Sequence, residues 1–152
     1  MELTGLYGDL QRENRRPRTE VLSLRTRPAE GRIASALRLG PGADTLVLRR
    51  LRYADDEPMA LPENHLPAGL LDPGEKELSA HGLYALFRRA GLALRSAEQT
   101  IGARRATASE ARLLAEARGG ALLTMARTVL GDGGARWSSA PTSTGRPGTP
   151  SR

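Results

Sequence analysis

The stretch LVLRRLRYADDEPMALPENHLP, residues 46–67, most constrains how this chain of 152 residues folds. Apolar residues alternate on both sides of a short acidic turn at residues 55–58, a pattern typical of two antiparallel strands joined by a tight turn. Because side chains on a strand alternate between the two faces of a sheet, Arg50 and Arg52 point to the same face. Two such guanidinium groups form either a solvated face or a site for a small anion.

The rest of the chain alternates between strand and helix patterns. Alternating apolar residues predict strands over residues 21–29, 93–107 and 121–130, and helical spacing predicts helices within residues 29–39 and over 83–91. Another helix is expected to begin after Thr107, because Thr107 and Glu110 fit a capping box. The turn-rich segment 66–82 is expected to be a loop. This order predicts an α+β fold around a mainly antiparallel sheet.

The two ends of the chain differ from this pattern. Residues 1–19 are polar and rich in arginine, with one short amphipathic piece, GLYGDLQ, and are interpreted as a linker or arm. From residue 133 the chain becomes a Ser, Thr, Pro, Gly and Arg tail, which is typical of disorder. We therefore expect one domain over residues 20–132, between an arm and a tail.

Composition excludes several kinds of chemistry. The chain has no cysteine, which rules out disulfides, thiolate catalysis and cysteine metal sites. The two histidines, His65 and His81, lack a metal-ligating spacing, and no phosphate-binding loop or nucleophile motif occurs, so neither a metal nor a cofactor is expected. No signal peptide or apolar run of about 20 residues is present, so we expect a cytoplasmic protein without membrane contact.

The net charge of +6 raises the possibility of nucleic-acid binding. The arginines are nevertheless scattered among acidic residues, and few aromatic residues are available to stack on bases. Direct binding through the arginines of residues 12–18 stays a secondary hypothesis, and it predicts a DNA affinity that depends strongly on salt.

Two further residues are candidates for ligand contacts. Tyr84, near the start of a short helix, has a hydroxyl that a ligand could use, although a single tyrosine at helical spacing is more often part of a core. Glu63, on the returning strand, could accept hydrogen bonds from a ligand, although an exposed carboxylate on a strand is the simpler interpretation.

Several ordered landmarks together resemble a known family. They are the helix ending in LRLGPG, the RLR strand with its acidic turn and proline, the returning strand ending in LP, the LY-initiated helix and the ATASEA helix start. This succession, over roughly residues 20–132, resembles the UTRA effector-binding domain of GntR-type transcription regulators of the HutC subfamily.

The resemblance implies a chorismate-lyase-like fold that binds a small, often anionic, metabolite between the sheet and its covering helices. It implies a homodimer in which the ligand re-orients winged helix-turn-helix domains on DNA, and we expect such a domain to be absent from the given residues. By position, the family's ligand-binding residues fall on Arg50, Arg52, Tyr84 and, on the penultimate strand, Arg127.

The chain also departs from the family pattern. The family often has a glutamate four residues after the proline that follows the acidic turn, where this chain has Pro62 and places Glu63 one residue later, so Glu63 is expected to face the other way. The family's last strand is missing from the tail, but a shifted reading frame of the back-translated tail restores its pattern. We therefore expect the last strand to be lost through a frameshift near Ser139.

The leading hypothesis is a non-enzymatic domain that senses an anionic metabolite for a transcription regulator. The alternatives are a nonfunctional truncated remnant and, because the fold is shared, an enzyme resembling chorismate lyase. The sequence offers no acid, base or nucleophile at the expected site to support the enzyme.

Overall fold

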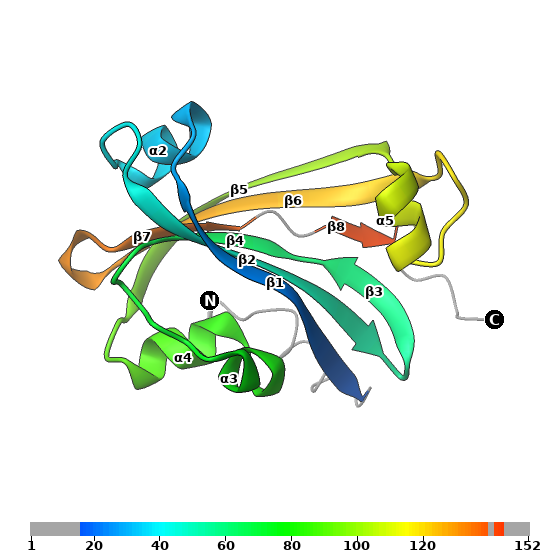
Figure 1. Cartoon of the computed structure of the whole chain (residues 1–152), viewed down its shortest axis with the longest axis horizontal. Coiled ribbons are helices and arrows are strands. Elements are labelled where there is room, and N and C mark those ends of the chain that lie inside the picture. The colour runs from blue at the N-terminus through cyan, green and yellow to red at the C-terminus, as the bar shows by residue number, and fades with distance from the viewer. Residues whose placement is uncertain (1–15, 140–141, 145–152) are drawn as a thin grey trace.

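The computed structural model describes residues 16–139 and 142–144 (Figure 1). The strands are β1 (Pro17–Pro28), β2 (Asp44–Ala54), β3 (Glu57–Leu61), β4 (Glu63–Pro67), β5 (Leu94–Arg105), β6 (Ala121–Gly131), β7 (Arg136–Ser139) and β8 (Thr142–Thr144). The helices are α2 (Gly31–Leu37), α3 (Glu75–Ala80), α4 (Leu83–Arg89) and α5 (Ala108–Leu113), and a short 3-10 turn, η1 (Asp132–Gly134), precedes β7. The predicted α+β fold is confirmed.

All strand pairs in the sheet are antiparallel. β3 and β4 follow one another along the same side of β2, and the carbonyl of Pro62 between them accepts a hydrogen bond from the Arg50 amide. β7 and β8 likewise pair with one side of β6 in a single register. The sheet therefore runs in the spatial order β1, β2, β3 with β4, β8 with β7, β6 and β5.

Each face of the sheet carries its own apolar cluster. We call the face that packs on α3 and α4 the inner face; its buried cluster includes Leu48, Leu66, Phe87 and Trp137. The opposite, outer face packs on α5 through the cluster Leu51, Leu61, Ala106, Ala111, Leu114 and Leu122. In Figure 1, α3 and α4 lie below the central strands, α2 lies at the upper left, and α5 lies at the right beside β8.

The hairpin and the capping box are confirmed. Asp55 and Asp56 both have positive φ angles, 51° and 65°, as in the tight turns that join twisted antiparallel strands. The Thr107 hydroxyl accepts a hydrogen bond from the Glu110 amide, and the Glu110 carboxylate accepts one from the Thr107 amide. None of the helices in the described part of the chain has the length and apolar character needed to cross a membrane.

The predicted loop over residues 66–82 is wrong in part, because it contains α3. The Gly74 amide donates to the Glu77 carboxylate at the start of this helix, and Leu78 is fully buried in the inner cluster. Tertiary packing of one leucine therefore outweighs the turn-forming residues around it.

Three predictions about the ends also need correction or fall outside the structure. Strand β1 begins at Pro17, inside the predicted arm. The prediction that no strand follows residue 133 is wrong, because β7 and β8 fill the place between β3 with β4 and β6. Backbone pairing on both sides and the burial of Trp137 compensate for the low-complexity sequence. The GLYGDLQ piece and residues 145–152 lie outside the described residues, and the frameshift stays a prediction.

Candidate functional site

Arg50 lies on the inner face of β2, next to the apolar cluster. Arg50 is two residues after Leu48 of that cluster, so both side chains point to the same face, and Arg52, two residues further on, points there as well. Arg50 is 2% exposed and Arg52 is 5% exposed. The expected pair of arginines on one face is therefore present, and it is buried rather than solvated.

The guanidinium of Arg50 is only partly satisfied. Its Nη2 donates to Oδ1 of Asn64 at 3.1 Å, whereas within the described residues no acceptor contacts its Nε or Nη1. Burial, and then repulsion from Arg52, lowers the pKa of Arg50 from its ordinary value to about 9, so the group still carries its charge at neutral pH. A buried cation with two nitrogens that lack an acceptor is costly by itself, and each of these nitrogens can donate a hydrogen bond to an anion.

A second polar group on the inner face joins Tyr84, Arg127 and Gln99. Nη1 of Arg127 donates to the Tyr84 hydroxyl at 2.6 Å, and its Nε and Nη2 donate to Oε1 of Gln99 at 3.0 and 2.6 Å. The Arg127 guanidinium also lies 5.9 Å from the centre of the Tyr84 ring. These contacts hold the Arg127 side chain in one orientation beside α4.

Strand register relates the two polar groups. Asn64 pairs with Ser139, Ser139 pairs with Arg127, and Arg127 pairs with Gln99, so one row of residues crosses β4, β7, β6 and β5. Two strand spacings separate the backbones of Asn64 and Arg127, which is about 10 Å. The Arg50 and Arg127 groups therefore border the same stretch of the inner face.

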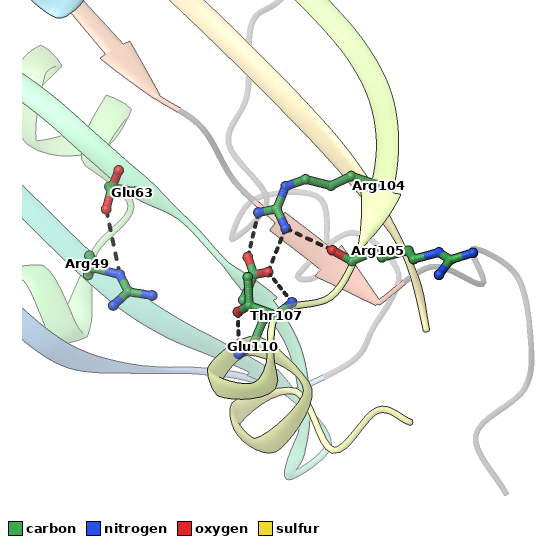
Figure 2. A network of polar contacts seen from close by, with 6 residues as sticks. All are labelled: Arg49, Glu63, Arg104, Arg105, Thr107 and Glu110. Carbon is green, nitrogen blue, oxygen red and sulfur yellow. Dashed lines mark hydrogen bonds and ion pairs between the residues drawn. The ribbon is translucent and has the colours of Figure 1, made fainter. Parts of the chain in front are cut away.

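Glu63 is not part of this arrangement. It lies on the outer face of β4, where its carboxylate is 3.6 Å from Nε of Arg49 and 3.2 Å from Nε2 of His65. Figure 2 shows the Arg49–Glu63 pair in the same view as the Arg104–Glu110 pair near α5. The hydrogen bond with His65, opposed by partial burial, lowers the pKa of Glu63. Alternation along the strand, as expected, turns Glu63 away from Arg50 and Arg52.

The sequence did not point to Asn64 or Gln99. Asn64 could have been found from its alternation with the buried Leu66, which puts both residues on the inner face. Gln99 carried no such signal, because its contact with Arg127 follows from the register between β5 and β6. Among the described residues, no group of three or more His, Asp or Glu side chains is arranged to hold a metal ion.

The family model for the UTRA domain matches residues 12–135. The chain belongs to the UTRA domain family. The same residues contain the buried arginines of β2, the Tyr84 helix and Arg127, so the sequence resemblance and the structural site fall within one domain.

Known relatives of this UTRA domain are named as transcriptional regulators. A solved structure from Streptomyces coelicolor, named as a transcriptional regulator, is 44% identical, covers 90% of this chain and 91% of that chain, and has a TM-score of 0.82. The ligand-binding domain of a protein named as a GntR-family regulator from Bordetella bronchiseptica is 25% identical over 84% of this chain and 82% of that chain, with a TM-score of 0.77.

A curated relative gives the same class of protein. A protein named as the transcriptional regulator PhnF, from Escherichia coli strain K12, is 32% identical over 99 residues, or 64% of this chain. The aligned part spans 41% of that relative. The match to PhnF therefore concerns less than half of PhnF's length.

Proposed function

We propose that this UTRA domain senses a small anionic metabolite on the inner face of its sheet. The observation that carries the proposal is Arg50, a buried cation with two guanidinium nitrogens that lack an acceptor among the described residues. A carboxylate or phosphate is the natural partner of such a group, because its charged oxygens accept strong, charge-assisted hydrogen bonds from guanidinium N–H groups. Buried unsatisfied polar atoms are rare in folded proteins, and ligand binding explains this one.

The remaining inner-face residues suit the rest of an anionic ligand. Arg52 adds positive charge beside Arg50, and the Tyr84–Arg127 pair supplies a fixed cation and a hydroxyl on the other side of the Asn64 row. The apolar cluster that contains Trp137 of β7 and Phe87 of α4 packs against Tyr84. Such a site, with few polar groups on a rigid apolar support, fits a small ligand.

The role we propose is regulatory rather than catalytic. The described inner-face polar set, Arg50, Arg52, Asn64, Tyr84, Arg127 and Gln99, holds neither a carboxylate nor a histidine to move protons. Glu63 and His65, which could do so, lie together on the outer face. A chorismate-lyase-like reaction is therefore not favoured by these side chains.

The ligand would act through linkage. In a cytoplasmic homodimer of the HutC type, an anion that binds one dimer geometry more tightly shifts the population toward it. Winged helix-turn-helix domains attached to the UTRA domain would then change their affinity for operator DNA. The ratio of the anion's affinities for the two dimer geometries sets how much the DNA affinity changes.

The test is anion binding measured by thermal unfolding and calorimetry. A panel of carboxylates and phosphate esters, with inorganic phosphate as the simplest probe, should contain ligands that raise Tm by several degrees when present well above Kd. For ligands with a single anionic group, Arg50→Met should abolish the rise, whereas Arg89→Gln, an exposed charge loss on α4, should preserve it. A panel without any stabilising anion, or equal losses in both variants, would refute the proposal.

A further inference from the structure

The outer face of the sheet carries an arginine-rich cleft that the inner-face site does not use. The cleft has a volume of about 450 Å³, within the range of roughly 300–1,000 Å³ seen for small-molecule sites. It is lined by Leu22, Ser23, Arg25, Arg27, Val47, Arg49 and Glu63. We call it the outer cleft.

Strand register explains how these side chains come together. Ser23 pairs with Arg49 and Arg49 with Glu63, so one row crosses β1, β2 and β4. The neighbouring row on the same face joins Arg25 to Val47. A β-bulge between Val21 and Ser23 shifts the register of β1, which lets the consecutive residues Leu22 and Ser23 both line the cleft.

The charges in the outer cleft are unequal. Three arginines face a single carboxylate, Glu63, whose pKa is lowered by His65 first and then, against the effect of burial, by Arg49 and Arg27. Arg25 and Arg27 are exposed and lie two residues apart on β1, whereas Arg49 projects from the next strand and is paired with Glu63. The cleft therefore has an excess of positive charge distributed over two strands.

We propose that the outer cleft is a second anion site, which takes a small molecule with two anionic groups joined by a short body. One group would contact Arg25 and Arg27 from β1, and the other would contact Arg49 in competition with Glu63. Leu22 and Val47 also line the cleft and would contact the body of the ligand.

The shape of the cleft favours a small dianion over a macromolecule. The acidic side chain of Glu63 borders one end, and it would repel the continuous phosphate backbone of a nucleic acid. Few aromatic side chains are present anywhere in the chain to stack on bases. A short ligand meets this carboxylate only at Arg49, where it competes with the Arg49–Glu63 ion pair.

The outer cleft shares strand β2 with the inner-face site. Arg49 and Arg50 are consecutive, so their side chains leave opposite faces of the same strand. The two sites can therefore be separated by mutation, because a side chain of one face can be changed without touching the other. If the outer cleft binds no anion, the proposed sensing role of Arg50 is unaffected.

The experiment uses pyrophosphate as a probe with two anionic groups and inorganic phosphate as the single-group control. Titration calorimetry is done on Arg50→Met, which lacks the inner-face arginine, with and without the double change Arg25→Gln and Arg27→Gln. We expect the double change to weaken pyrophosphate binding at least tenfold. Inorganic phosphate should bind at least tenfold more weakly than pyrophosphate. Where Arg50→Met does not fold, the double change is made in the unmodified chain, and the shifts that pyrophosphate causes in the β1 amides are compared by NMR with and without it.

A matched control removes two exposed arginines elsewhere, Arg89→Gln with Arg118→Gln. Equal weakening by this control would mean that net charge alone attracts pyrophosphate, and it would overturn the proposal. Absence of pyrophosphate binding to the chain would overturn it as well. Tighter binding of a 20-base-pair duplex, lost on the same double change at Arg25 and Arg27, would replace the small dianion with nucleic acid.

Discussion

The two faces of the sheet use arginine in different ways. On the inner face Arg50 is buried, has one hydrogen bond to Asn64, and keeps two nitrogens without an acceptor among the described residues. On the outer face Arg49 is part-exposed and faces the carboxylate of Glu63 at 3.6 Å. The two residues are consecutive on β2, so the sequence distinguishes them only through the alternation of side chains between the two faces of a strand.

The difference teaches that burial, rather than charge, marks the stronger candidate site. A solvated arginine is largely satisfied by water and by a weak surface ion pair. A buried arginine that keeps two nitrogens without an acceptor is stable only because the rest of the fold supports it, and a bound anion relieves this cost. The inner face should therefore bind an anion more strongly, and its side chains should matter more for stability.

The largest effect should come from the apolar support of the inner face. Trp137 is 1% exposed and stacks on Phe87 with ring centres 3.8 Å apart. Trp137→Ala should lower the free energy of unfolding by about 3–5 kcal/mol, because it leaves a large cavity. Urea unfolding followed by circular dichroism measures the change. Ile101→Ala, at a side chain that is 60% exposed, should change it by less than about 0.5 kcal/mol. Similar losses in both variants would show that β7 does not close the core.

The next effect separates binding from stability. Arg50→Met removes a buried charge, so the ligand-free domain should become more stable by about 1 kcal/mol or more, as when buried ionic groups are replaced by apolar ones. The affinity for an inner-face anion should fall by about 2 kcal/mol or more, roughly thirtyfold. Arg49→Met should change neither quantity by a comparable amount. Thermal unfolding with and without the best anion of the panel measures both, and a loss of stability in Arg50→Met would contradict the proposed cost of the buried cation.

A third prediction concerns the outer face at α5. Glu110 accepts two hydrogen bonds from Arg104 at 2.6 Å and caps the helix through the Thr107 amide (Figure 2). The side-chain hydrogen bond from Arg104 is the main reason that the pKa of Glu110 falls from 4.5 to about 2. Because the folded-state pKa is lowered, this stabilisation is complete above pH 4.5 and is lost as the pH falls toward 2.

Glu110→Gln should therefore cost about 1–2 kcal/mol at neutral pH, in the range of a lost helix cap. Below pH 4.5 the difference between Glu110→Gln and the unmodified chain should shrink. Urea unfolding at pH 7 and at a series of lower pH values measures this convergence. A difference that is constant over the whole series would mean that the charge of Glu110 contributes nothing.

Much of this arrangement follows from strand alternation, which is readable in the sequence. Alternation predicted that Arg50 and Arg52 share a face and that Glu63 turns away from them. The helix start at Thr107 was also predictable, because its capping groups are close in sequence. Features that depend only on neighbouring residues were therefore accessible without a structure.

Features that depend on distant partners were not accessible. Residues 136–139 and 142–144 have little strand character of their own, and they become β7 and β8 because β6 on one side and β3 and β4 on the other need pairing. Helix α3 depends on the burial of Leu78 in the inner cluster. The Asn64 and Gln99 contacts likewise depend on cross-strand register and on which side chains are buried.

The smallest effect should come from Glu63, and it tests the comparison of the two faces most directly. Its ion pair with Arg49 is part-exposed, so Glu63→Gln should change the free energy of unfolding by less than about 1 kcal/mol. Inner-face anion affinity, measured by calorimetry, should stay within about twofold, whereas Asn64→Ala should weaken it because Asn64 orients the Arg50 guanidinium. In the Arg50→Met background, Glu63→Gln should strengthen pyrophosphate binding, since among the described residues it removes the only carboxylate that lines the outer cleft. A large loss of inner-face affinity in Glu63→Gln would mean that the two faces are coupled through β2 rather than independent.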